Sequence, residues 1–255
     1  MNWLRRLLYR PRASGSSYQP KDSRDLKFQE EFTVGSVGVK SIPSLTNWGA
    51  MPNQGSTNSC VGFGIARMLE ILISQTVKEE TGDDWYDDVS ELFIWYLARE
   101  IEESTDKNVG VIPRNAFKGL FKHGYLTSDL MPFVDSHTEY PSDFDFAAAE
   151  FARSMLLSMK FKYYAVRKSD ALALVKKGQA VGVALPMNYT WGSRWTKDVS
   201  PSGGYHYMVL EDVIVKDGVS YCKFANSWGK GYLYVPKTYY MKHAQSLWTL
   251  AKKEK

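Results

Sequence analysis

The sequence predicts an α+β fold with two lobes, the first mainly helical and the second rich in antiparallel strands. Apolar residues between 60 and 123 recur at helical spacing, whereas short β-branched and aromatic runs crowd residues 179–236. Residues 216–218 (KDG) separate two valine-containing runs, which is a strong β-hairpin signal. A helical half followed by an antiparallel half predicts two packed lobes, with a ligand cleft where they meet.

Three helices are predicted in the first half. Ser59 is expected to cap a helix over residues 60–77, and Ser90 is expected to cap a second one. Pro113 suits a first turn and is predicted to open a third helix that ends at Gly124. Apolar side chains cover most of the first helix, so it is expected to lie at the centre of its lobe: Val61, Ile65, Met68, Leu69, Leu72 and Ile73.

The second half is predicted to begin with a helix from Ser169 to Gly178 and to continue as strands. The predicted strands cover residues 179–187, 205–215, 219–226 and 231–236. The strands over residues 205–215 and 219–226 are expected to pair across the KDG turn. This pairing brings the start of the first strand next to the end of the second.

Cysteine usage predicts a reducing, intracellular (cytoplasmic) location. The 255-residue chain has two cysteines, Cys60 and Cys222, too far apart in sequence for a CxxC motif. No metal site is expected from them. The N-terminus lacks the continuous apolar region of a secretory signal, and no unbroken apolar run reaches the ~18 residues of a membrane span.

Charge is concentrated at the N-terminus. Residues 1–27 contain seven basic and two acidic residues, although the net charge of the whole chain is +4. We therefore expect a mobile basic arm at residues 1–27, with a flexible linker over 11–24, and a folded domain at residues 28–255. The remainder is close to neutral, which argues against nucleic-acid binding. The alternative for the arm is weak contact with a membrane or a partner; the domain itself is expected to be a monomer.

An excess of negative charge lies between Glu79 and Asp106. This stretch contains eleven acidic residues and a single basic residue, Arg99. Their spacing does not resemble a calcium-binding loop. We interpret this stretch as a solvated acidic face.

Cys60 is placed for nucleophilic chemistry. At the N-terminus of a helix, unpaired N–H groups and the helix dipole favour a thiolate, although a buried structural cysteine is the ordinary alternative. Acyl transfer by a thiolate also needs a base and a group that orients it. His206 begins an apolar strand, and hairpin pairing predicts that Asn226 lies beside it. Cys222 is interpreted as an inert core residue.

Three motifs carry a resemblance to the papain family of cysteine peptidases. QGSTNSC resembles the segment around that family's nucleophile, GGYHYMVLEDV its histidine strand, and FANSWGKGY its Asn-Ser-Trp-Gly motif. Weaker similarity extends the match to roughly residues 42–240. The resemblance implies a papain-like fold, in a bacterial or viral member that lacks disulfides.

The resemblance also implies roles for individual residues. Cys60 would be the nucleophile, His206 the general base and acid, and Asn226 the residue that orients the imidazole. Gln54 would supply an oxyanion donor, and Trp228 would shield the His206–Asn226 bond from water.

Substrate contacts are implied for Gly110, whose backbone would pair with an extended peptide. Val183 and Leu185 are expected to line the pocket that accepts an apolar side chain. Thr57, Asn58 and Val61 depart from the family pattern beside the nucleophile, and a second Trp-Gly segment after Trp228 is missing.

The function predicted from these residues is peptide-bond hydrolysis through a Cys60 thioester, on a peptide or protein substrate and without a cofactor. Two alternatives remain open. One is a Cys-His amidase or isopeptidase that acts on a non-standard substrate, and the other is a catalytically silent binding protein on the same scaffold.

Overall fold

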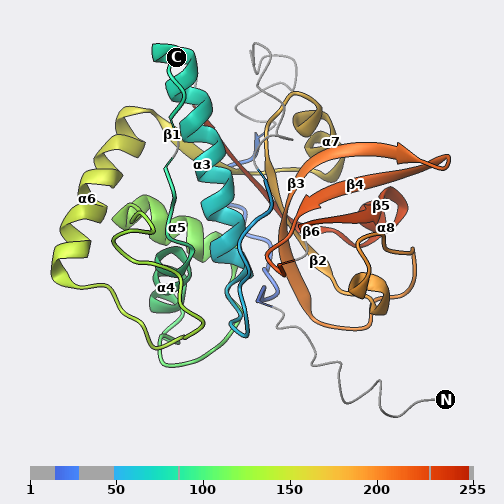
Figure 1. Ribbon diagram of the computed structural model, residues 1–255, viewed down its shortest axis with the longest axis horizontal. Coiled ribbons are helices and arrows are strands. Elements are labelled where there is room, and N and C mark those ends of the chain that lie inside the picture. The colour runs from blue at the N-terminus through green and yellow to red at the C-terminus, as the bar shows by residue number, and fades with distance from the viewer. Residues whose placement is uncertain (1–14, 29–48, 86, 230, 253–255) are drawn as a thin grey trace.

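The computed structural model describes residues 15–28, 49–85, 87–229 and 231–252. Helix α3 (Cys60–Thr81) runs up the centre, with α4 (Glu91–Ile101), α5 (Pro113–His123) and α6 (Asp143–Ser158) on one side and the sheet on the other (Figure 1). The remaining elements belong to the sheet and its connections: β1 (Phe161–Ala165), α7 (Lys168–Lys176), β2 (Val181–Pro186), η2 (Tyr189–Gly192), β3 (Tyr205–Lys216), β4 (Val219–Ala225), β5 (Tyr232–Pro236), α8 (Lys237–His243) and β6 (Gln245–Lys252). This is the predicted α+β fold with two lobes.

The described strands form one antiparallel sheet in the order β1-β6-β2-β3-β4-β5. The predicted hairpin joins β3 to β4, with Lys216 opposite Val219. Asp217 and Gly218 between them have φ angles of 50° and 75°, as a two-residue hairpin turn requires. Strands β1 and β6 and helices α6 and α8 were not predicted.

Some of the helix boundaries follow local sequence signals, whereas α7 begins at Lys168, before the predicted Ser169, and has no side-chain cap. The Ser90 hydroxyl accepts a hydrogen bond from the Phe93 N–H, and Pro113 occupies the first turn of α5, as predicted. Ser59 does not cap α3, because its hydroxyl is hydrogen bonded to the Thr57 hydroxyl at 2.6 Å.

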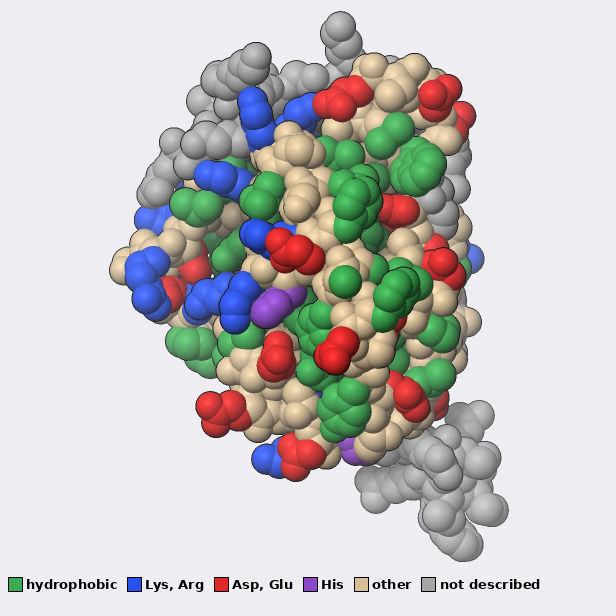
Figure 2. Space-filling view, turned by 90° about the vertical axis from the view of Figure 1, so that its left-hand side faces the viewer, with side chains coloured by type: hydrophobic (Ala, Val, Ile, Leu, Met, Phe, Trp, Pro, Cys, Tyr) green, Lys and Arg blue, Asp and Glu red, His purple; other side chains and the backbone are tan. Residues whose placement is uncertain are grey.

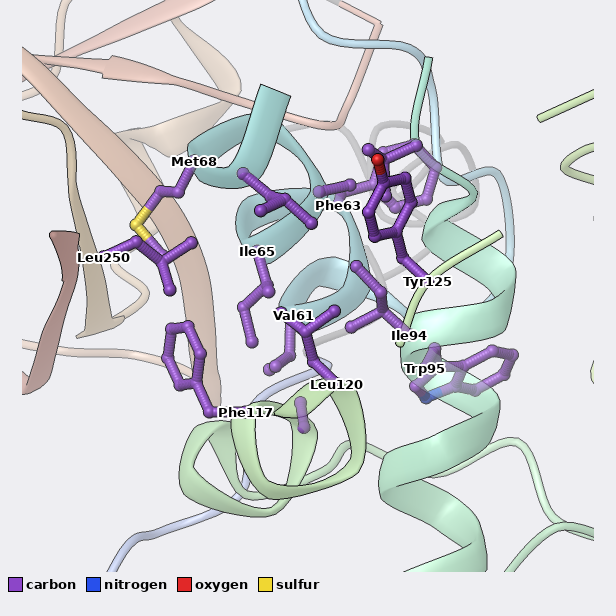
Figure 3. Packing of buried hydrophobic residues seen from close by; sticks show 14 of the residues in the cluster. Val61, Phe63, Ile65, Met68, Ile94, Trp95, Phe117, Leu120, Tyr125 and Leu250 are labelled. Atoms are coloured by element: carbon purple, nitrogen blue, oxygen red, sulfur yellow. The ribbon is translucent and has the colours of Figure 1, made fainter. Parts of the chain in front are cut away.

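Helix α3 joins the two halves of the core. Its side chains meet those of α4 and α5 on one side and Leu250 of β6 on the other (Figure 3). By length and composition α3 alone among the described helices could cross a membrane, but 83% of its apolar stretch is buried inside the fold. The second core cluster lies within the sheet lobe and contains Trp191, Met208, Phe224 and Tyr240.

The outer face of the helical lobe is formed by α6. Phe144 and Phe151 are 73% and 71% exposed there, and Tyr140 and Leu157 are also exposed. Figure 2 shows this face, on which apolar and acidic side chains lie side by side.

Residues 15–28 differ from the predicted arm and linker because they lie on the folded domain. Arg114 of α5 donates to both carboxylate oxygens of Asp25, at 2.6 and 2.5 Å, and this ion pair is largely buried. Arg114 also donates to the Pro20 carbonyl, and Phe28 is completely buried in the sheet lobe. The composition of this stretch suggested a linker, yet these tertiary contacts fix it. The rest of the predicted arm, residues 1–14, lies outside the described residues.

Candidate active site

Cys60 is the first residue of α3 and is completely buried where the two lobes meet. Its Sγ accepts a hydrogen bond from the backbone N–H of Tyr207, at 3.3 Å. Because Tyr207 follows His206 on β3, this bond holds the strand that carries the histidine against the tip of α3. The two predicted catalytic side chains, 146 positions apart in sequence, therefore belong to one site.

His206 is held by residues that return from the far end of the hairpin. Its Nε2 lies 2.9 Å from Asn226 Oδ1, so the tautomer that places a proton on Nε2 donates to the amide oxygen. The Trp228 ring stacks on the imidazole, with centroids 4.1 Å apart and planes 20° apart. The imidazole of His206, the amide of Asn226 and the indole of Trp228 therefore lie together, with the indole stacked on the imidazole.

Gln54 is completely buried beside this group. Its Oε1 accepts a hydrogen bond from the Ser227 hydroxyl at 2.6 Å, and its Nε2 donates to the Thr57 carbonyl at 2.7 Å. The Gln54 N–H also donates to the Ser227 carbonyl. These bonds fix the side-chain amide in one orientation, with one Nε2 hydrogen used by Thr57 and the second left for a further acceptor.

Residues 15–17 lie between the two lobes, directly against Cys60. Ser16 forms a parallel bridge with Val111 of the helical lobe and an antiparallel bridge with Tyr205 of β3. Ser17 donates its hydroxyl to the Gly110 carbonyl at 2.7 Å. The segment therefore adds a short strand at the lobe boundary, next to the glycine that was predicted to pair with a peptide.

The burial of Cys60 affects the ionisation of its thiol. Burial raises the pKa of Cys60 to about 12, while backbone N–H groups of Tyr207, Gly15 and Val61 act in the opposite direction. Removal from water disfavours the charged form more than these donors favour it. Burial therefore acts against the thiolate that the position of Cys60 at the tip of α3 favours.

Val183 and Leu185 do not line the lobe boundary, which corrects the predicted side-chain pocket. Both are completely buried in the core cluster of the sheet lobe. Ala184, between them on β2, faces α3 in the other cluster together with Tyr207. Side chains alternate between the two faces of a strand, so an alignment displaced by one residue selects the wrong face.

Sequence reasoning missed several residues of the site. Trp191 of η2 lies 6.4 Å from the His206 ring and 6.0 Å from the Trp228 ring, between centroids. It supplies a second tryptophan near the histidine, although the second Trp-Gly segment that the resemblance led us to expect after Trp228 is missing. Ser227, which donates to Gln54, and Asn108, which accepts a hydrogen bond from the Asn58 N–H, were also missed, because only tertiary contacts reveal these roles. Among the described residues, no cluster of three or more His, Cys, Asp or Glu side chains could hold a metal ion.

Comparison with solved structures places this geometry among known folds. Xylellain, a cysteine protease from Xylella fastidiosa, superposes with a TM-score of 0.74 at 21% identity, over 97% of this chain and 99% of its own. The chain has the papain-like fold. No protein-family model and no curated protein sequence matches it.

More distant structures share this papain-like fold. A proCathepsin B from Trypanosoma congolense has a TM-score of 0.64 at 13% identity, over 95% of this chain and 87% of that one. A digestive procathepsin L 3 from Tenebrio molitor has a TM-score of 0.57 at 14% identity, over 93% and 73%. The sequence motifs for a papain-like fold are therefore matched by the architecture along almost the whole chain.

Proposed function

We propose that this protein is a cysteine peptidase in which Cys60 forms the acyl intermediate. The observation that carries the proposal is the convergence of Cys60 at the start of α3, His206 on β3 and Asn226 directly after β4, with His206 Nε2 2.9 Å from Asn226 Oδ1. The structures of similar fold include cysteine proteases, which supports the same chemistry.

In the proposed reaction, His206 takes the thiol proton and the Cys60 sulfur attacks the peptide carbonyl carbon. The second Nε2 hydrogen of Gln54 and the Cys60 N–H stabilise the oxyanion of the tetrahedral intermediate. His206 then gives its proton to the leaving amine as the C–N bond breaks, which leaves a thioester on Cys60. Water, deprotonated by His206, attacks the thioester and releases the acid and the thiol.

Asn226 and Trp228 act on the histidine rather than on the substrate. The Nε2–H group of His206 donates to the amide oxygen of Asn226. This bond orients the ring so that Nδ1 is the nitrogen that accepts the proton of the Cys60 thiol. The indole of Trp228 keeps water away from this hydrogen bond, which strengthens it.

The conformation described above is a closed state of the proposed enzyme. Residues 15–17 occupy the lobe boundary where an extended substrate would pair with Gly110, and they remove Cys60 from solvent. Hydrolysis therefore requires that this segment leave the site.

The proposal is tested with an epoxide inhibitor that alkylates active-site thiols, together with a fluorogenic peptide library. We expect the wild-type chain to be labelled at Cys60 and to hydrolyse peptides, and Cys60→Ala to do neither. Cys222→Ala is the matched control, because Cys222 is also free and buried but lies in the core of the sheet lobe. Labelling that persists in Cys60→Ala would refute the assignment.

The closed state supports one alternative, a catalytically silent binding protein on this scaffold. The observation in its favour is that Cys60 is 0% exposed beneath Gly15. If peptides, isopeptides and cell-wall fragments all remain intact even after residues 15–17 are displaced, the silent scaffold is the better account. Cleavage of isopeptides or cell-wall fragments alone would identify the amidase alternative.

A further inference from the structure

We propose that a pocket between the N-terminal segment and the sheet lobe binds a small amphiphilic anion, an apolar group that ends in a negative charge, and that this ligand keeps the active site closed. The pocket has a volume of about 630 Å³, within the ~300–1,000 Å³ of small-molecule sites in proteins. Neither Cys60 nor His206 lines it, so it is separate from the candidate active site. The inference does not require that Cys60 be catalytic.

The roof of the pocket is the N-terminal segment over residues 18–27, which is fixed to the domain near both of its ends. Gln19 Oε1 accepts a hydrogen bond from the Trp248 indole at 3.1 Å. Lys27 forms a parallel bridge with Ala165 at the end of β1. The buried ion pair to α5 lies between these two contacts in the sequence. The roof therefore encloses a pocket against the sheet lobe.

The floor of the pocket is apolar. It is built around the end of β1 and the start of β6 from small or hydrophobic side chains: Ala165, Val166, Ala244, Leu247 and Trp248. Ser246, which also lines the pocket, has a φ angle of 48°, a left-handed conformation that is unfavourable for a residue other than glycine. Such backbone strain tends to occur at binding sites. The floor suits the apolar part of a ligand, whose transfer out of water is favourable.

The ionisable side chains that line the pocket carry an excess of positive charge. Four are basic and two are acidic: Lys21, Lys27, Arg167, Lys168, Asp22 and Asp25. Both carboxylates are already paired with arginines, Asp22 with Arg24 and Asp25 with Arg114. The ion pairs of the described residues include neither Lys21 nor Lys168. The pocket therefore favours an anion over a neutral or cationic ligand.

Lys168 still has a hydrogen available for an anion. Its Nζ donates to the carbonyls of Met241 and Lys242, at 2.8 and 3.4 Å, which uses two of the three hydrogens of an ammonium group. Lys168 belongs to the sheet lobe, whereas Lys21 belongs to the roof. An anion in the pocket would attract both, and would thereby hold the roof against the sheet lobe.

The roof is continuous with the segment that covers Cys60. Ser17 donates its hydroxyl to the Gly110 carbonyl, and the next residue, Tyr18, lines the pocket. A ligand that contacts both roof and floor binds the closed conformation better than one in which the roof has moved, so it favours the closed state. By reciprocity, displacement of residues 15–17 is expected to weaken binding of the ligand.

The first experiment measures binding to the full-length protein by isothermal titration calorimetry. Octanoate supplies both an apolar chain and a charge, octanamide supplies the chain alone, and acetate supplies the charge alone. We expect the Kd of octanoate to be at least tenfold lower than that of either control compound. N-acetylphenylalanine is titrated as well, because a peptide C-terminus presents the same chemistry as a free acyl chain. Whichever of the two binds more tightly identifies the source of the ligand.

Charge-reversed variants locate the site. Lys21→Glu and Lys168→Glu are each expected to raise the Kd of octanoate at least fivefold, and having two variants guards against one that fails to fold. Lys176→Glu is the matched control, because it makes the same change of charge on an exposed residue of α7 outside the pocket. It is expected to leave the Kd unchanged.

The second experiment tests the link to the active site. Saturating octanoate is expected to slow alkylation of Cys60 by iodoacetamide at least threefold in the wild-type chain. In Gly15→Ala, in which residues 15–17 are displaced, octanoate should not protect Cys60, and its Kd should rise at least threefold.

Each part of the inference can be overturned. Absence of binding by both octanoate and N-acetylphenylalanine would refute the site, and so would an octanoate affinity that both Lys21→Glu and Lys168→Glu retain. Equal binding of octanoate and octanamide would refute the role of charge. Binding that leaves the alkylation of Cys60 unchanged would refute the link to the closed state. None of these results depends on peptide hydrolysis, so failure of the proposed function would leave them standing.

Discussion

Asn226 Oδ1 lies 2.9 Å from His206 Nε2, and Trp228 covers the imidazole with a stacked indole. The hydrogen bond is buried, so its effect on the orientation of the ring is not diluted by water.

We expect Asn226→Ala to lower kcat about 10- to 100-fold with little change in KM, because the imidazole loses its orientation while the substrate contacts remain. Steady-state kinetics on a fluorogenic peptide gives both constants. Asn188→Ala serves as a control for general destabilisation, since Asn188 is also buried but caps η2. A loss that lies entirely in KM would contradict the orienting role.

The Gly15→Ala variant is expected to open the site. Its Cβ would meet Asn58 and Cys60 backbone atoms, so residues 15–17 cannot stay between the lobes. Peptide hydrolysis should rise at least fivefold over the wild-type chain, and proteases should cut the N-terminal segment more readily. Gly192→Ala is the matched control, because a Cβ there meets no atom within 4 Å. Equal activity in the three proteins would show that residues 15–17 do not limit access.

The same variant is expected to change the pH dependence of thiol labelling. Burial raises the pKa of Cys60 to about 12 in the closed state, so the thiol stays protonated at neutral pH. In Gly15→Ala the thiol of Cys60 is expected to be exposed to water, which lowers its pKa. A larger fraction of the thiol is then ionised at any given pH below 12. Iodoacetamide labelling measured from pH 5 to 10 should therefore reach half of its maximal rate at a lower pH in Gly15→Ala than in wild type. Coincident profiles would contradict this account.

The ion pair between Arg114 and Asp25 is expected to fasten the N-terminal segment. Both side chains are largely buried, and removing one partner leaves an uncompensated charge, which costs about 3–5 kcal/mol at buried sites. Asp25→Ala should therefore lower the free energy of unfolding in urea and increase cleavage of residues 15–28 in limited proteolysis. Asp22→Ala is the control, because Asp22 pairs with the exposed Arg24. Unchanged proteolysis in Asp25→Ala would show that this ion pair does not hold residues 15–28 on the domain.

Tyr207 offers a test of stability alone. Its hydroxyl is buried without a hydrogen-bond partner among the described residues, whereas the Tyr239 hydroxyl donates to the Pro186 carbonyl. Tyr207→Phe is expected to raise the free energy of unfolding by about 1 kcal/mol, because an unsatisfied buried group is removed. Tyr239→Phe should lower it by a similar amount. Urea unfolding of both variants checks the signs, and a loss of stability in Tyr207→Phe would reveal an unrecognised partner.

Sequence patterns predicted the fold class and the central residues of the site, although they missed β1, β6, α6 and α8. Local signals such as Ser90, Pro113 and the turn at Asp217 and Gly218 act over a few residues, so they can be read without the fold. The hairpin then brings Asn226 to His206, because pairing across a two-residue turn fixes which positions meet.

The surroundings of Cys60, in contrast, depend on contacts between residues that are far apart in sequence. Residues 15–17 have the composition of a linker, and only their bridges to Val111 and Tyr205 show that they close the site. The face of β2 was misassigned because a shift of one residue reverses every side chain, so Val183 and Leu185 belong to the core. Contacts such as Asn58 with Asn108 join loops 50 positions apart, and no local pattern encodes them, because they form only when the folded chain brings the two loops together.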